Sequence, residues 1–493
     1  MTASTATTLG EFCCHLEHAD IPEDVRRAAR WHLVDTLGVC IAGSDPSLPG
    51  GQALRTVTEQ WHNESARSVV LGMGLSCRPE AAALINGALA QSLEMDDKHG
   101  PSLARPGSTV IPAALAVGQD RGLSAEEVVT AIVVGYEVMI RLGLVAGDRF
   151  LRRGYHTSSL LGVFGAAATV GRLLRHDRAK IVDALGIAGS FAAGIQESTR
   201  TGSTSKILHG GWGAHGGVLA VDLAAAGITG PDSVFEGHYG FFRSHLTPIE
   251  GELDWEVAVR SLGDRWYLPE TAFKPYPCCE LLHSFIEGGM KLRARLASDG
   301  VAVSDIEELS CQLAEPGLTL VTEPEQRKRA PQQAHEARFS LPFVLASTLV
   351  NGDIGTDSFT AAALADPEVL AVAARVGWSE DLHSDYPLHY PARLEARAGA
   401  RRYSFHVPHH PGSPEAPLSE GAVLSKFAKN TSFLLGPNAA EVGARLADPP
   451  GAQPLRDWLA GAMGSRSRGS GSADGARRGD APSVAGRYGE GGP

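Results

Sequence analysis

The stretch SAEEVVTAIVVGYEVMIRLG, residues 124–143, begins with Ser124 and has Glu127 three residues later. This spacing is a capping box, in which the two side chains bind the free backbone N–H groups at the start of an α-helix. The residues that follow are mostly apolar or small and leave no wide polar face, so the helix must be covered by other helices. The stretch therefore predicts a buried helix inside a helical domain.

Helical patterns flank this stretch on both sides. They cover residues 21–44, 79–95, 107–122, 156–174, 179–195 and 215–231. Apolar residues recur in them at helical spacing, and Ala and Gly are frequent, which suits helices that pack closely. We expect residues 1–267 to form the first part of a large all-helical domain.

The pattern changes near residue 268. Residues 304–314 and 392–408 have strand-like stretches, whereas residues 358–376 are helical in character. We predict a mainly α protein with a smaller α/β domain at residues 268–412 and a return to the helical domain at residues 413–463. Residues 464–493 are Gly, Ser, Arg and Pro with almost no apolar content, which predicts a disordered tail.

Composition and charge exclude several classes of protein. The formal net charge of −12 repels phosphate backbones, so nucleic acid is not expected as a partner. The seven cysteines are odd in number and show no disulfide framework or CxxC pair. We see no secretory signal, and no apolar run approaches the roughly 20 residues that span a bilayer. These features predict a protein of the reducing cytoplasm without a membrane partner.

Four polar clusters carry the residues suited to chemistry. The first, residues 93–108, holds Glu94, Asp96, Asp97, Lys98, His99 and Arg105. The second, residues 152–159, holds His156 at a helix start, where the pKa of an imidazole is lowered and the ring can act as a base. The third, residues 203–217, holds Lys206, His209 and His215. The fourth, residues 273–285, holds Lys274, Tyr276, Cys278, Cys279 and His283.

Three further patterns have ordinary structural explanations. Gly211, Gly213 and Gly216 spell the dinucleotide-binding sequence GxGxxG, but no convincing strand precedes them. Glycines that allow helices to approach closely explain them better. The spacing of Cys278, Cys279 and His283 matches no common zinc site. His406, His409 and His410 could bind a metal weakly, although a polar loop is the preferred interpretation, and we expect no metal site.

These clusters, in this order, resemble the 2-methylcitrate dehydratase and cis-aconitate decarboxylase family (MmgE/PrpD). The resemblance covers residues 8–450. It rests on LEMDD (93–97), PGSTVIPAALA (106–116), GYHTSSLLGVFGAAA (154–168), ALGIAGSFAAG (184–194), SKILHGGWGAHGG (205–217), GITGPDSVFEGHYGF (227–241), KPYPCCELLH (274–283) and HEARFSLPF (335–343). It implies a helical domain with an α/β lid, an active site between them, a homodimer, and no metal or organic cofactor.

By position, the resemblance implies a pocket built from His156, Lys206, His283 and the carboxylates of LEMDD. Three departures stand out. Glu94 replaces an Asp, Lys98 replaces a Thr, and Arg105 replaces a His that the decarboxylase branch is presumed to use. A Tyr that the lid contributes in that branch has no clear counterpart in residues 320–338. Arg cannot serve as an ordinary general base but suits two-pronged binding of a carboxylate.

We therefore expect a cofactor-independent lyase, in first place a dehydratase of a β-hydroxy carboxylic acid, for example an intermediate of natural-product biosynthesis. His156 and His283 would share the base and acid roles, and Glu94 or Asp96 would orient a His or exchange a proton with the hydroxyl. Lys206 and Arg105 would hold carboxylates, helped by Lys98, His209 and Lys274. The alternatives are a decarboxylase of a cis-aconitate-like acid, an epimerase or isomerase, and a non-catalytic acid-binding protein.

Overall fold

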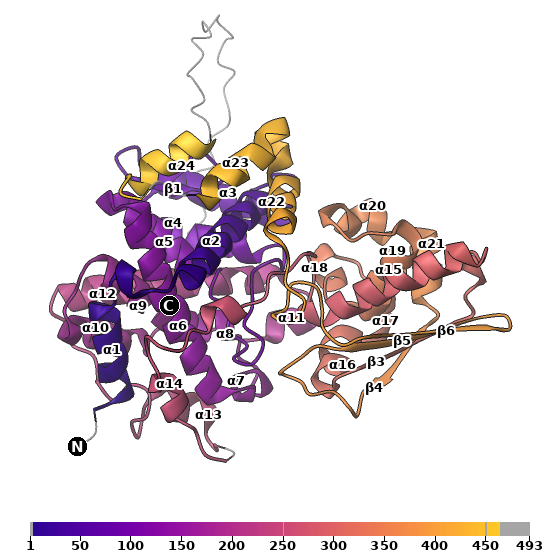
Figure 1. The fold of residues 1–493 in the computed structure, drawn as a ribbon, viewed down its shortest axis with the longest axis horizontal. Coiled ribbons are helices and arrows are strands. Elements are labelled where there is room, and N and C mark those ends of the chain that lie inside the picture. The colour runs from indigo at the N-terminus through magenta and orange to yellow at the C-terminus, as the bar shows by residue number, and fades with distance from the viewer. Residues whose placement is uncertain (1–2, 250, 449–450, 464–493) are drawn as a thin grey trace, which may run out of the picture.

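The computed structural model describes residues 3–249, 251–448 and 451–463 (Figure 1). Helices dominate these ranges, and the strands form one hairpin and one four-stranded sheet. The chain has the expected mainly α architecture, with a large helical body beside a smaller α/β body (Figure 1). The predicted disordered tail, residues 464–493, lies outside the described residues.

The helical domain contains seventeen α-helices among the described residues. They are α1 (Thr5–His15), α2 (Glu23–Gly43), α3 (Pro49–Trp61), α4 (Pro79–Gln91), α5 (Val110–Arg121), α6 (Ala125–Ala146), α7 (Arg149–Arg152), α8 (Thr157–Leu160), α9 (Gly162–Leu173), α10 (Arg178–Ala188), α11 (Glu197–Thr201), α12 (Leu208–Ala225), α13 (Phe241–Leu246), α14 (Glu256–Val259), α22 (Glu420–Leu435), α23 (Ala439–Ala447) and α24 (Leu455–Met463). The hairpin of β1 (Ser68–Val70) and β2 (Leu75–Cys77) belongs to the same body.

Helix α6 lies at the centre of this domain. Ser124 and Glu127 form the predicted capping box at its start. Contrary to the expectation that no apolar run approaches the length of a membrane span, α6 is long and apolar enough to cross a membrane by length and composition. However, 94% of its most apolar window is buried inside the protein, because other helices surround it. Its charged pair, Glu137 and Arg141, is buried with Nε of the arginine 3.1 Å from the carboxylate.

The glycine-rich stretch of the third polar cluster forms helix α12, not a nucleotide-binding loop. A Cβ added to Gly211 would lie 2.1 Å from the carbonyl oxygen of Leu84 in α4. One added to Gly217 would lie 2.4 Å from the Cβ of Ala166 in α9. The glycines therefore allow α12 to pack directly against two neighbouring backbones, as the sequence suggested.

The α/β domain contains a mixed sheet in the order β4-β3-β5-β6, in which only β3 and β4 are parallel. Its strands are β3 (Glu308–Leu313), β4 (Val376–Glu380), β5 (Ala392–Ala398) and β6 (Arg401–Val407). Its helices are α15 (His283–Ser298), α16 (Glu315–Thr322), α17 (Glu325–Arg329), α18 (Ala334–Ala337), α19 (Leu341–Asn351), α20 (Ala361–Leu364) and α21 (Pro367–Ala373). Helix α15 packs on β5 and β6 and against α19.

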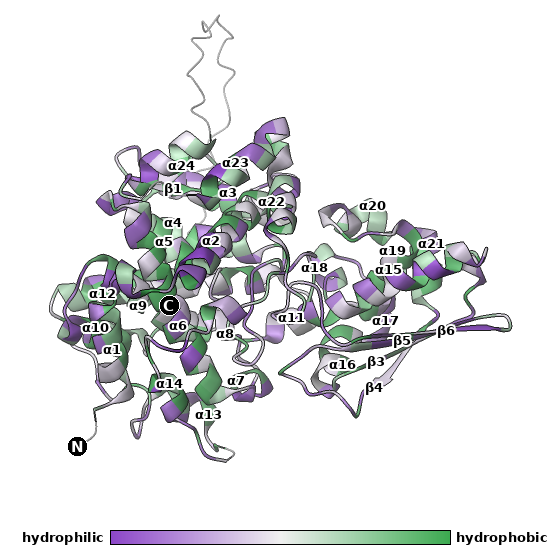
Figure 2. Ribbon diagram, in the orientation of Figure 1, coloured by the Kyte–Doolittle hydropathy of each residue, from purple (hydrophilic) through white to green (hydrophobic). Residues whose placement is uncertain are grey.

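The two bodies have separate hydrophobic cores. One core joins residues between Ala6 and Leu268 to residues between Phe427 and Ala462, and the other lies between Cys278 and Tyr403. Helices α15 and α22 alternate between hydrophilic and hydrophobic residues (Figure 2), as expected for helices with one face in a core and one in solvent. All seven cysteines are free.

Candidate active site

A buried ion cluster lies where the first, third and fourth polar clusters meet. We define the ion cluster as Glu94, Asp96, Arg105, Lys206 and Lys274. The loop between α4 and α5 supplies three of these residues. Lys206 comes from the short 3₁₀ helix η2 (Thr204–Ile207), and Lys274 comes from the segment that leads into the α/β domain. Glu94 has a left-handed backbone, with φ of 56°, which is uncommon outside glycine and often marks a functional site.

Each carboxylate of the ion cluster contacts two cations. The Lys206 ammonium group contacts Oε1 of Glu94, and Nη1 of Arg105 lies 3.4 Å from the other oxygen. Asp96 Oδ1 lies 3.3 Å from Arg105 and 3.7 Å from Lys274. Lys274 also donates to the backbone oxygen of Glu94 at 2.9 Å. With three cations and two carboxylates, the ion cluster has one formal positive charge left for an anionic ligand.

The cations hold the Glu94 carboxylate in its charged form. Burial alone would raise its pKa, but Lys206, Lys274 and Arg105 outweigh this effect and hold the pKa below the usual range. Burial lowers the pKa of Lys206, and Glu94 opposes that shift. Glu94 and Lys206 therefore form a buried ion pair in which each charge stabilises the charged form of the other.

His156 and His209 form a pair beside the ion cluster. Their Nδ1 atoms lie 3.1 Å apart, and His156 is buried at the N-terminal end of α8. Burial, followed by Lys206 and His209, holds the pKa of His156 well below its usual value, and burial and Lys206 lower the pKa of His209 to about 4. Both rings are therefore neutral near pH 7, so one Nδ1 carries a hydrogen and the other accepts it.

This pairing determines what the other nitrogen of His156 can do. Nε2 of His156 is buried and has no hydrogen-bond partner in the described structure. If Nδ1 of His156 carries the hydrogen, Nε2 has a free lone pair and is a base. If His209 is the donor, Nε2 of His156 carries a hydrogen and is a hydrogen-bond donor. The same pair can thus present a base or a hydrogen-bond donor to a ligand.

A small cavity of about 60 Å³ lies between the two bodies at this point. Its wall on the helical side includes Arg105, His156 and Lys206, and its wall on the other side includes Phe339 and Tyr390. A water molecule takes up about 30 Å³ of liquid. The cavity therefore has room for a few atoms beside the unpartnered nitrogen of His156 and the two cations.

Lys98 does not join the ion cluster but links the two bodies. Its ammonium group lies 2.8 Å from the carboxylate of Glu280 and donates to the Tyr390 hydroxyl at 2.7 Å. His410 Nε2 lies 3.5 Å from the other oxygen of Glu280. Burial would raise the pKa of Glu280, but Lys98, His410 and Lys274 hold it below its usual range. Lys98, Glu280 and Tyr390 line the same cavity as Arg105.

The structure separates two other predicted residues from the cavity. His283 is fully buried, its Nε2 lies 3.4 Å from the Cys278 carbonyl, and it is not among the described residues that line the cavity. Asp97 accepts hydrogen bonds from the Tyr136 hydroxyl at 2.6 Å and the Gly107 N–H at 2.8 Å, and lies 2.8 Å from Nδ1 of His32. Asp97 therefore organises the loop, whereas Asp96 belongs to the ion cluster.

Sequence reasoning missed several residues of the site. Tyr386 and Tyr390 line the cavity. They follow β4 and so lie outside residues 320–338, where the sequence shows no clear counterpart of the lid tyrosine. Glu280 was overlooked between two cysteines and two leucines. Burial lowers the pKa of His335 to about 4 and also lowers that of Arg338. The charge of Glu94 opposes both shifts. The quoted HEARFSLPF segment held the only signal for these two residues.

The comparison with protein families divides the chain near the start of the α/β domain, and the second match also includes α22 and α23 of the helical domain. The MmgE/PrpD N-terminal domain matches residues 7–252, and the MmgE/PrpD C-terminal domain matches residues 276–448. The chain belongs to the MmgE/PrpD family. This family assignment confirms the resemblance inferred from the ordered motifs, and it places the ion cluster and the His156–His209 pair in the N-terminal domain, except for Lys274.

Similar MmgE/PrpD proteins include cis-aconitate decarboxylases. A cis-aconitate decarboxylase of Aspergillus terreus is 29% identical over 390 residues, covering 76% of this chain and 78% of the relative. The cis-aconitate decarboxylase-like protein oryM of Aspergillus oryzae is 27% identical over 458 residues, covering 88% and 93%. The human cis-aconitate decarboxylase is 26% identical over 443 residues, covering 85% of each chain.

Proposed function

We propose that this MmgE/PrpD protein is a lyase that acts on a small carboxylic acid by proton transfer. The observation that carries the proposal is the position of His156. Its neutral ring has an unpartnered Nε2 and lines a cavity with Arg105 and Lys206. A base beside two cations is the arrangement needed to remove a proton from a carbon next to a carboxylate, because the cations stabilise the charge that builds on that carboxylate.

Dehydration of a β-hydroxy acid is our first candidate reaction. Nε2 of His156 would take the proton from the α-carbon, and its electron pair would form the double bond as the bond from the β-carbon to the hydroxyl breaks. The hydroxyl would leave as water after taking a proton from an acid, for which Lys206, with its lowered pKa, is placed on the same wall. The residual positive charge of the ion cluster would bind the substrate carboxylate.

Decarboxylation of a cis-aconitate-like acid is the second candidate, and the relatives favour it. In that reaction CO₂ leaves, its bonding electron pair stays on carbon, and a proton is then added to that carbon. Lys206, whose pKa burial lowers, lies on the same cavity wall and would supply the proton. Arg105 stands where the decarboxylase branch is presumed to use a His, and an arginine cannot take over a proton transfer at neutral pH. This substitution counts against a standard decarboxylation and indicates a related reaction on a different acid.

Proton NMR in D₂O with hydroxy and unsaturated di- and tricarboxylic acids tests the proposal. Dehydration would produce an olefinic signal without loss of carbon, and decarboxylation would release CO₂ and place deuterium on the product. We expect His156→Gln to slow turnover about 10²–10⁴-fold. His176→Gln, at a half-buried histidine before α10, is the matched control and should leave turnover unchanged. Full turnover by His156→Gln would refute the site, and tight binding of acids without turnover would favour an acid-binding protein.

A further inference from the structure

A second cavity of about 330 Å³ lies on the other side of Glu280 and Tyr390, which line both cavities. Two loops form one rim of this second cavity. One loop precedes β5 and carries His389, and the other follows β6 and carries His409 and Glu415. Because β5 and β6 are antiparallel, with Ala392 opposite Val407, their register brings the two loops together at one end of the sheet.

His389, His409 and Glu415 bring three potential metal ligands close together. Each residue offers one ligand atom, and these atoms lie within 4.8 Å of one another. Nε2 of His389 is 3.3 Å from Oε1 of Glu415, and Nδ1 of His409 is 3.9 Å from Oε2. Bonds of about 2.0–2.2 Å to a tetrahedral zinc ion place neighbouring ligand atoms about 3.3–3.6 Å apart. The distance from His389 to Glu415 already fits this spacing, the distance from His409 to Glu415 exceeds it by about 0.3–0.6 Å, and all the ligand atoms lie within 4.8 Å of one another.

Two further observations support a metal ion at this centre. Nδ1 of His389 is held by the carboxylate of Asp385 at 2.5 Å. Metal-binding histidines usually donate their second N–H to a carboxylate in this way, which orients the ring and raises its basicity. In addition, Nδ1 of His409 is buried without a hydrogen-bond partner in the described structure. Each histidine therefore has one ring nitrogen near Glu415 that can bind the ion. It is Nε2 in His389 and Nδ1 in His409.

The charges around the second cavity also suit a cation. Its described lining contains three carboxylates, those of Glu270, Glu280 and Glu415, and no lysine or arginine. Lys98 and Arg265 neutralise Glu280 and Glu270 from outside that lining. Glu415 contacts only histidines among its ion-pair partners in the described residues, so its charge is available to a metal.

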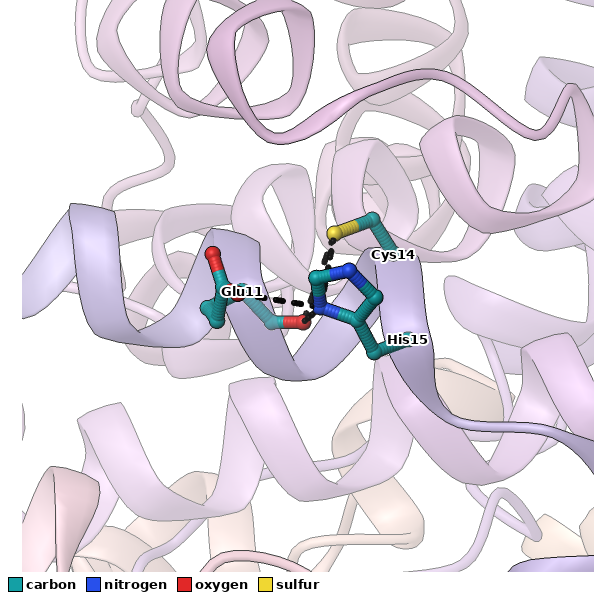
Figure 3. Close-up of side chains that lie close together, drawn as sticks. All are labelled: Glu11, Cys14 and His15. Atoms are coloured by element: carbon teal, nitrogen blue, oxygen red, sulfur yellow. Dashed lines mark hydrogen bonds and ion pairs between the residues drawn. The ribbon is translucent and has the colours of Figure 1, made fainter.

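The other group of potential ligands in the described residues is Glu11, Cys14 and His15, all on α1 (Figure 3). Here Glu11 is also paired with Arg178 at 3.3 Å. Burial, followed by Glu11, raises the pKa of the Cys14 thiol, which opposes the thiolate that a metal needs. His15 contacts the carboxylate of Glu11, a member of the group itself, whereas Asp385 supports His389 from outside the proposed ligands. The group on α1 serves best as an internal control.

We propose that His389, His409 and Glu415 form a binding site for a divalent transition-metal ion, with Asp385 as the positioning residue for His389. Two imidazoles and one carboxylate suit Zn²⁺, Co²⁺ or Ni²⁺, whereas Mg²⁺ prefers oxygen ligands. Three protein ligands leave one position open towards the second cavity for water or a carboxylate. The ion would tie together the two loops that carry Tyr390 and His410, and so stabilise the wall shared with the candidate active site.

Zn²⁺ and Co²⁺ titrations of the metal-stripped full-length protein test this site. We expect one equivalent of Zn²⁺ to bind and to raise the melting temperature, whereas Mg²⁺ should do neither. His389→Ala and His409→Ala should each weaken Zn²⁺ binding at least tenfold and remove the melting-temperature shift, and Asp385→Asn should weaken binding about 10–100-fold. His406→Ala, at an exposed histidine on β6, is the matched control and should bind normally.

The Co²⁺ spectrum distinguishes the two groups of ligands. At the proposed site the spectrum should lack a sulfur-to-cobalt charge-transfer band, and Cys14→Ser should leave it unchanged. Zn²⁺ binding that survives in both histidine variants but disappears in Cys14→Ser would overturn the proposal, as would the absence of Zn²⁺ binding. The melting temperatures of the metal-free variants show whether each one is folded. If His389→Ala unfolds because Asp385 loses its partner, His409→Ala still decides the outcome.

Discussion

The ammonium group of Lys98, from the helical domain, lies 2.7 Å from the hydroxyl of Tyr390, from the α/β domain. It also lies 4.2 Å from the centre of the Tyr390 ring and 2.8 Å from Glu280. One side chain therefore carries a hydrogen bond, a cation–π contact and an ion pair between the two bodies.

Lys98→Met should destabilise the protein more than Tyr390→Phe. The first change leaves the buried Glu280 carboxylate with His410 as its remaining ion-pair partner in the described residues, which should cost about 3–5 kcal/mol. The second removes one hydroxyl from a hydrogen bond to a charged group and should cost about 1.5–3 kcal/mol. Urea denaturation measures both values. Equal losses would show that Glu280 is not held by Lys98.

Glu94 and Lys206 should be strongly coupled in a double-mutant cycle. Glu94→Gln or Lys206→Met alone leaves a buried charge without its partner and should cost about 3–5 kcal/mol. The double variant removes both charges and should lose less than the sum of the two single losses. Additive free energies of unfolding would mean that the pair does not interact. Arg293→Met, at a partly buried arginine in α15, provides a control change outside the cluster.

Arg105→Lys should weaken substrate binding while keeping the charge. An ammonium group cannot reproduce the fork of N–H donors that a guanidinium offers to a carboxylate. The loss of one charged hydrogen bond is worth about 1.5–3 kcal/mol, so kcat/KM should fall roughly 10- to 100-fold. We expect most of the change in KM. An unchanged KM would show that Arg105 does not contact the substrate.

Stability should decrease as the pH falls from about 6.5 to about 4. Burial holds the pKa values of His209 and His335 near 4, whereas the unfolded chain binds protons at these histidines below their ordinary pKa of 6.5. The unfolded state therefore holds more protons in this window, and the free energy of unfolding rises with pH until about 6.5. His335→Gln should flatten the slope of urea midpoint against pH, and His406→Gln is the control. An unaltered slope in His335→Gln would contradict the prediction.

Gly211→Ala should destabilise the packing of α12 against α4. Its Cβ would meet the Leu84 carbonyl oxygen, and such overpacking costs about 1–3 kcal/mol or more. Gly461→Ala in α24 is the matched control, because its Cβ would meet nothing within 4 Å. That change should be neutral or stabilise by about 0.4–1 kcal/mol, since alanine lowers the entropy of the unfolded chain. Thermal unfolding of both variants measures the difference, and equal melting temperatures would refute the packing argument.

The sequence predicted best where local patterns and packing agree. The capping box at Ser124, the helix starting at Pro79 and the glycines of α12 follow from side-chain chemistry and periodicity. The ordered motifs pointed to the family, which the domain matches confirm. The apolar length of α6 was underestimated, because Glu137 and Arg141 interrupt it in sequence although they neutralise each other in space.

Much of the site depends on contacts between distant residues, which spacing alone does not reveal. Lys98 lines the cavity, and its partners Glu280 and Tyr390 lie 182 and 292 positions away in the sequence. Asp96 and Asp97 are adjacent in sequence and contact different partners. The pairing of His156 with His209, and hence the neutral state of both rings, required the approach of α8 and α12.

The discontinuity of the helical core has a consequence for synthesis on the ribosome. The ring of Phe427 in α22 packs over Gly38 of α2, where an added Cβ would lie 2.8 Å away. The ribosome makes α2 first and reaches α22 only after the whole α/β domain. At roughly 5–20 residues per second this takes about 20–80 s. During that time the face of α2 that packs against α22 stays uncovered. This surface is therefore where a nascent chain would aggregate and where chaperones would be needed.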